Sequence, residues 1–71
     1  MAAVYAGQVQ TSLKEIVRRN DGAITRRELI ESATLELGID RERVVTQLET
    51  LDQKGEVYHV GDGDDAEVRV P

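Results

Sequence analysis

The chain has 71 residues, which is room for one domain with one core but not for a second lobe or a deep substrate cleft. It contains no cysteine, so disulfides and thiolate metal sites are excluded. Nine basic residues against fourteen acidic ones give a net charge of -5. This balance is poor for a generic nucleic-acid binder, because contacts to phosphates supply most of the nonspecific affinity.

The sequence shows neither an export signal nor an apolar run of the ~20 residues that span a bilayer. We therefore expect a cytoplasmic protein without a membrane partner. The expected organisation is a single domain over residues 1–71, with residues 1–7 as a flexible N-terminal segment. Charge is uneven, because residues 1–27 carry five basic and two acidic side chains, whereas residues 28–71 carry four basic and twelve acidic ones.

The first predicted helix covers residues 8–20. Its apolar face has helical spacing and contains Val9, Leu13, Ile16, Val17 and, at the end, Asn20. The sequence Asn20-Asp21-Gly22 then favours a turn. The segment 23–25 is too short for an independent strand, but it can pair as a stub at a sheet edge.

Two further helices are predicted, separated by a tight turn. Thr25 followed three residues later by Glu28 is the capping-box pattern, so a helix is expected from Thr25 to about Leu37, with Gly38 in the left-handed region behind it. Asp40 is a suitable N-cap for the next helix, over residues 41–54. The apolar stripes of the two helices are Leu29, Ile30, Ala33 and Leu37, and Val44, Leu48 and Leu51.

After Gly55 the period of the apolar residues changes to two. Residues 56–60 and 66–70 are short runs rich in β-branched residues, and the glycine and aspartate residues between them suit the tip of a hairpin. The order of helix, stub, helix, turn, helix and hairpin predicts an α+β winged helix-turn-helix domain. The alternative is a three-helix bundle with a disordered tail. The alternation of residue types along both runs argues against this alternative.

The segments Gly38-Ile39-Asp40 and Leu48-x-x-Leu51-x-x-x-Gly55-Glu56-Val57-Tyr58 resemble the C-terminal winged-helix domain of archaeal minichromosome maintenance (MCM) replicative helicases. The resemblance covers about residues 12–70. It implies an appendage that tunes a hexameric helicase and contacts DNA or partner proteins. The turn over residues 61–65 is longer and more acidic than that family leads us to expect, which puts contacts through the wing in doubt.

The residues argue against an enzyme and indicate no cofactor. The phosphate-binding pattern G-x-x-x-x-G-K-[ST] is absent, so ATP hydrolysis by that route is excluded. His59 is the only histidine, and packing or an outward position on a strand is more typical of it than acting as a base. Asp62, Asp64 and Asp65 lack the EF-hand spacing, so an acidic turn is favoured over a calcium site. Tyr58 is expected to pack between the hairpin and a helix.

Seven residues are the candidates for contact with nucleic acid or a partner: Arg26, Arg27, Arg41, Arg43, Thr46, Thr50 and Gln53. In a winged helix the third helix enters the major groove, where Arg43 can bind guanine and Gln53 can bind adenine. Arg26 and Arg27 can bind a phosphate, or they can pair with acidic residues on the surface. Glu42 and Glu49 share the exposed face of the third helix and oppose DNA binding.

Two hypotheses remain. The favoured one is a regulatory or protein-interaction module of a DNA replication helicase, whose partner is a replication protein or the helicase core and which binds double-stranded DNA weakly if at all. The alternative is the sequence-specific DNA-binding domain of a small transcription regulator. The two aromatic side chains, Tyr5 and Tyr58, are too few for single-strand binding by base stacking.

Overall fold

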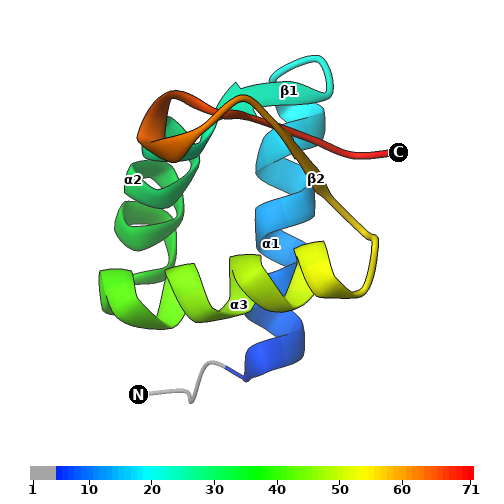
Figure 1. The fold of residues 1–71 in the computed structure, drawn as a ribbon. Coiled ribbons are helices and arrows are strands. Elements are labelled where there is room, and N and C mark those ends of the chain that lie inside the picture. Colours follow the sequence, from blue (N-terminus) through cyan, green and yellow to red (C-terminus); the bar gives the residue numbers. More distant parts are fainter. Residues whose placement is uncertain (1–4) are drawn as a thin grey trace.

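Three helices and a three-stranded antiparallel sheet make up the computed structural model, which describes residues 5–71 (Figure 1). In chain order the elements are α1 (Ala6–Arg19), β1 (Ala23–Thr25), α2 (Arg26–Leu37), α3 (Arg41–Gln53), β2 (Tyr58–Val60), the 3₁₀ turn η1 (Gly63–Asp65) and β3 (Glu67–Arg69). The α+β class is confirmed, and the arrangement is compatible with a winged-helix-like fold. Helix α1 begins two residues earlier than predicted; of the segment expected to be flexible, residues 1–4 lie outside the described residues.

The ends of α2 follow the local sequence. Thr25 Oγ1 accepts a hydrogen bond from the backbone N–H of Glu28 at 3.2 Å, so the predicted cap is confirmed. Gly38 ends the helix with φ of 64°, in the left-handed region. Asp40 does occupy the N-cap position of α3, but its side chain makes no capping hydrogen bond, so the sequence was right about the position and wrong about the contact.

Helix α3 ends in a hydrogen-bonded C-cap that turns the chain into the hairpin. The N–H of Glu56 donates to the carbonyl of Leu51 at 2.9 Å, and the N–H of Gly55 donates to that of Asp52 at 3.0 Å. This pair of bonds places Gly55 at φ of 76°, a conformation that costs glycine little and other residues more. The chain therefore leaves α3 in a defined direction.

The sheet has the order β1-β3-β2, so the predicted stub is confirmed as an edge strand. Ile24, Val68 and His59 lie side by side across it. Ile24 and Val68 are buried against the helices, whereas Tyr58 is 42% exposed. Tyr58 alternates with His59 along β2 and lies on the outer face, so the expectation that it packs between the hairpin and a helix was wrong.

The core lies between the three helices and the inner face of the sheet (Figure 1). Its largest fully buried side chains are Leu13, Ile16, Leu29, Leu48, Leu51, Val9, Val17, Val44, Val57 and Val68. All were expected from the apolar periodicity. Among the described residues the core contains no polar or charged side chain, and no helix is long and apolar enough to cross a membrane.

The hairpin runs from the end of α3 to the N-terminal end of α2, where its turn lies against the helix (Figure 1). The N–H of Arg26 donates to the carbonyl of Ala66 at 2.8 Å, and the side chain of Ala66 is buried. The segment 61–65 beyond this contact is exposed at every residue. The turn thus brings its carboxylates to the start of α2.

Candidate interaction surface

The acidic turn and three of the predicted contact residues form one group of charges. Arg26 Nη1 lies 3.0 Å from Asp64 Oδ1, and Arg41 Nη2 lies 4.0 Å from the same oxygen. Arg27 Nη1 lies 2.6 Å from Asp65 Oδ1. We call these five residues the tip cluster. The turn therefore supplies a counter-charge to Arg26 and to Arg27, whereas the exposed Arg41 lies farther from its carboxylate.

The tip cluster is assembled from α2, α3 and η1. Its members differ in exposure, because the side chain of Arg26 is 21% exposed and that of Asp65 is 81% exposed. The hydrogen bond and charge of Asp65 raise the pKa of Arg27 above its usual value. Each arginine of α2 therefore faces a carboxylate of the turn.

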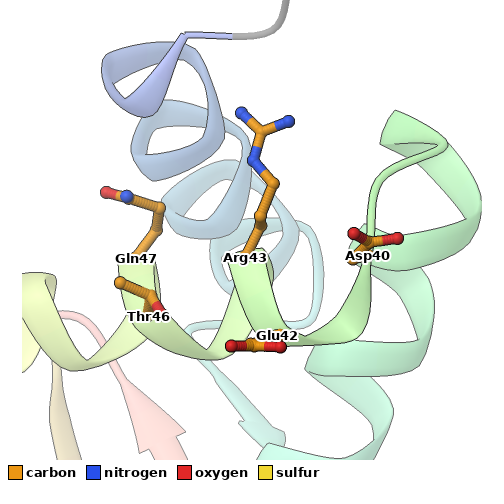
Figure 2. A pocket seen from close by; sticks show the side chains of 5 residues that line it. All are labelled: Asp40, Glu42, Arg43, Thr46 and Gln47. Carbon is orange, nitrogen blue, oxygen red and sulfur yellow. The ribbon is translucent and has the colours of Figure 1, made fainter.

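The remaining candidates lie on α3, away from the tip cluster. Arg43 and Thr46 line a hollow of 340 Å³ together with Asp40, Glu42 and Gln47. Figure 2 shows Arg43 and Gln47 leaving one side of α3, whereas Glu42 leaves another. Gln47 Oε1 accepts from Gln10 of α1 at 2.8 Å, so this side of α3 is the one toward α1.

The exposed face of α3 is less available to a ligand than the sequence suggests. Thr46 and Gln53 are exposed, but Thr50 is half-buried, and its hydroxyl donates to the carbonyl of Thr46 at 3.0 Å. The seven candidates consequently form no single patch. Three gather in the tip cluster, and four are spread along α3.

A second hollow, of 280 Å³, lies between α3 and the hairpin, and we call it the acidic groove. It is lined by Arg26, Glu49, Asp52, His59, Gly61, Asp62, Gly63 and Ala66. His59 Nδ1 is buried and lies 3.0 Å from Asp52 Oδ2, although the angle between the groups does not make a hydrogen bond. The pair is therefore an ion pair only when the imidazole is protonated. Three carboxylates against one guanidinium give this groove a negative surface.

A second group of charges holds the start of the hairpin, and we call it the entrance cluster. Glu56 lies between two lysines, at 2.5 Å from Nζ of Lys14 and 3.4 Å from Nζ of Lys54. The two hydrogen bonds from these lysines lower the pKa of Glu56. Lys54 also donates to Gln10 of α1 at 3.0 Å. The entrance cluster thus joins α1, the end of α3 and the first residues of the hairpin.

The charged residues of the tip cluster could be identified from the sequence, but the residues that they pair with could not. Arg26 and Arg27 were expected to bind phosphate or to pair with acidic residues on the surface, and the structure pairs them with the turn, 38 residues along the chain. The available signal was the acidic turn, because successive carboxylates at a hairpin tip attract any arginine that the fold brings near them.

The turn aspartates also bear on metal binding. Asp64 and Asp65 face guanidinium groups rather than a common point. Within residues 5–71 there is no group of three or more His, Cys, Asp and Glu side chains that could hold a metal ion.

No protein-family model matches the chain, and neither a curated protein nor a solved structure is significantly similar to it.

Proposed function

We propose that the chain is a non-catalytic winged-helix module that binds a protein partner through the acidic groove and the neighbouring face of α3. The partner that the resemblance to MCM helicases suggests is a replication protein or the core of the helicase. In this proposal α2 and α3 are the helix-turn-helix and β2 and β3 are the wing. The order of the elements and the docking of the hairpin on the helices support it.

The observation that carries the proposal is the distribution of charge. A DNA-binding wing needs cations at its tip, whereas this turn carries aspartates that pair with the arginines of α2. The acidic groove adds Glu49, Asp52 and Asp62 beside α3. Carboxylates on this surface repel phosphates and favour a partner with Lys and Arg on its surface.

The absence of catalysis is part of the proposal. The only histidine, His59, is buried at Nδ1 against Asp52, on a strand that carries no serine, threonine or cysteine. The described residues that line the acidic groove with His59 likewise include no serine, threonine or cysteine that could serve as the nucleophile.

The test is a titration of isotope-labelled protein with the purified core of a replicative helicase from the same source. We expect the amide shifts to concentrate on α3 and on residues 59–63. Glu49→Gln should weaken binding, because Glu49 lies in the acidic groove. Glu15→Gln, an equal change of charge on an exposed position of α1, is the matched control and should leave binding unchanged.

A parallel titration with a short DNA duplex separates the two hypotheses. Shifts confined to Arg43, Thr46 and Gln53 that saturate with one sequence and not another would contradict the proposal and establish the sequence-specific DNA-binding alternative. The helicase assignment itself fails if the core gives no shifts at all.

A further inference from the structure

The tip cluster has the composition of a phosphate-binding site. Its three guanidinium groups come from two helices and converge on two carboxylates. Guanidinium groups bind carboxylates and phosphates by the same charge-assisted hydrogen bonds. Both anions present two oxygens that can accept a pair of parallel N–H···O bonds. The aspartates of η1 therefore occupy positions that phosphate oxygens could fill.

The arrangement points to a chain of anions rather than a lone one. Asp64 Oδ1 lies beside both Arg26 and Arg41, and Arg27 pairs with the next residue, Asp65. The three arginines therefore face two anionic groups in succession, and a nucleic-acid strand supplies anionic groups in succession because every nucleotide carries a phosphate. A duplex fits better than a single strand because Tyr58, one of two aromatic residues, lies on the outer face of the sheet rather than beside the cluster.

We propose that the three arginines of the tip cluster form a binding site for consecutive phosphates of duplex DNA, which the two aspartates occupy in the free protein and vacate when DNA binds. The wing tip is then an internal competitor that keeps DNA affinity low. Arg26 lines the acidic groove as well, but this inference does not rest on the proposed protein partner, because it concerns the ion pairs between the arginines and η1.

The contacts that hold the aspartates are ones that a polyanion can displace. Every residue from Gly61 to Asp65 is exposed, so no buried side chain anchors the tip. Exposed ion pairs contribute little and are screened by salt. Gly61 and Gly63 have φ of 97° and 66°, and glycine changes such conformations without a steric penalty. The tip can therefore leave while Ala66 stays packed.

The test compares the DNA affinity of two variants that lose the same charge from the same turn. Asp64→Asn removes the negative charge that faces Arg26 and Arg41, whereas Asp62→Asn is the matched control, because Asp62 has no ion pair among the described residues. Affinity for a labelled mixed-sequence duplex is measured by fluorescence anisotropy at several salt concentrations. Thermal unfolding of each variant verifies that it is folded.

We expect Asp64→Asn to tighten binding about fivefold more than Asp62→Asn, the factor that corresponds to the upper range for one exposed ion pair. Adding Arg26→Gln to the Asp64→Asn chain should remove the gain and reduce the salt slope of log K by about 0.9, the value for one phosphate contact. In the unaltered protein the amides of Gly63 and Asp65 should shift with DNA.

Three results would overturn the proposal. Equal gains from Asp64→Asn and Asp62→Asn would mean that only net charge matters. Binding of DNA without shifts in η1 would place the site elsewhere. Inorganic phosphate or a phosphopeptide that competes as well as the duplex at equal phosphate concentration would make this a site for a lone anion. Glu49→Gln leaves the tip cluster intact, so failure here is distinguishable from failure of the proposed protein-binding surface.

Discussion

The entrance and the tip of the hairpin differ in how they contact the helices. At its entrance the chain follows a hydrogen-bonded C-cap of α3, Val57 is buried, and the entrance cluster adds ion pairs to α1 and α3. At its tip, within the part of the chain that the structure describes, the exposed residues 61–65 are joined to the side chains of α2 and α3 by the ion pairs of the tip cluster. Buried side chains therefore support the ion pairs at the entrance, whereas the tip has ion pairs without buried side chains, so a charged ligand can displace the tip more easily.

The largest effect on the free energy of unfolding is expected when a buried side chain is removed at the entrance. Leu51→Ala removes a fully buried side chain at the end of α3, and we expect it to reduce the free energy of unfolding by about 2–5 kcal/mol. Urea denaturation measures the change. Leu35→Ala is the control, because Leu35 is 84% exposed and should change stability by at most about 0.5 kcal/mol. Equal effects of the two would show that packing does not hold the entrance.

A smaller effect is expected from the backbone at the same place. Gly55→Ala puts a side chain at φ of 76°, which costs about 1–2 kcal/mol, although no atom lies within 4 Å of the added Cβ. Gly7→Ala, in open space on α1, should instead stabilise by up to about 1 kcal/mol. Differential scanning calorimetry measures both, and a Gly55→Ala chain as stable as the parent would contradict the assigned C-cap.

The entrance cluster should give a weaker, pH-dependent contribution. Because the folded-state pKa of Glu56 is lowered, folding favours its charged form. The stability it adds is complete above its unfolded value of about 4.5 and is lost as the pH falls through the folded-state pKa. Glu56→Gln should therefore be less stable than the parent at pH 7, and the two should converge in acid. If urea denaturation shows that the two free energies of unfolding still differ at the lowest pH, the difference does not come from the ion pairs of Glu56.

The tip should show the smallest effect on stability. We expect Asp64→Asn to cost at most about 1 kcal/mol at low salt and nothing measurable at high salt, because its partners are exposed or half-buried arginines. Asp62→Asn again serves as the control. A larger or salt-independent loss would mean that the tip is held by more than charge, and it would then be a poor candidate for displacement by DNA.

The sequence by itself determined the order of the elements, both ends of α2 and the core, but not the side-chain contact of Asp40 at the start of α3. Helical and strand periodicities identified the buried residues, and Thr25 and Gly38 act through hydrogen bonds and dihedral angles within a few residues of themselves. The predicted boundaries of α1 and of the strands differ from the structure by one or two residues, because the final turn of an element depends on what packs against it.

The surface was decided by the tertiary structure. Arg26 meets Asp64, 38 residues away, only because the hairpin returns to the start of α2, and no local pattern encodes that distance. The path of the hairpin also places Tyr58 on the outer face of the sheet. Burial follows from the period of a single element, whereas ion pairing depends on where two distant elements meet.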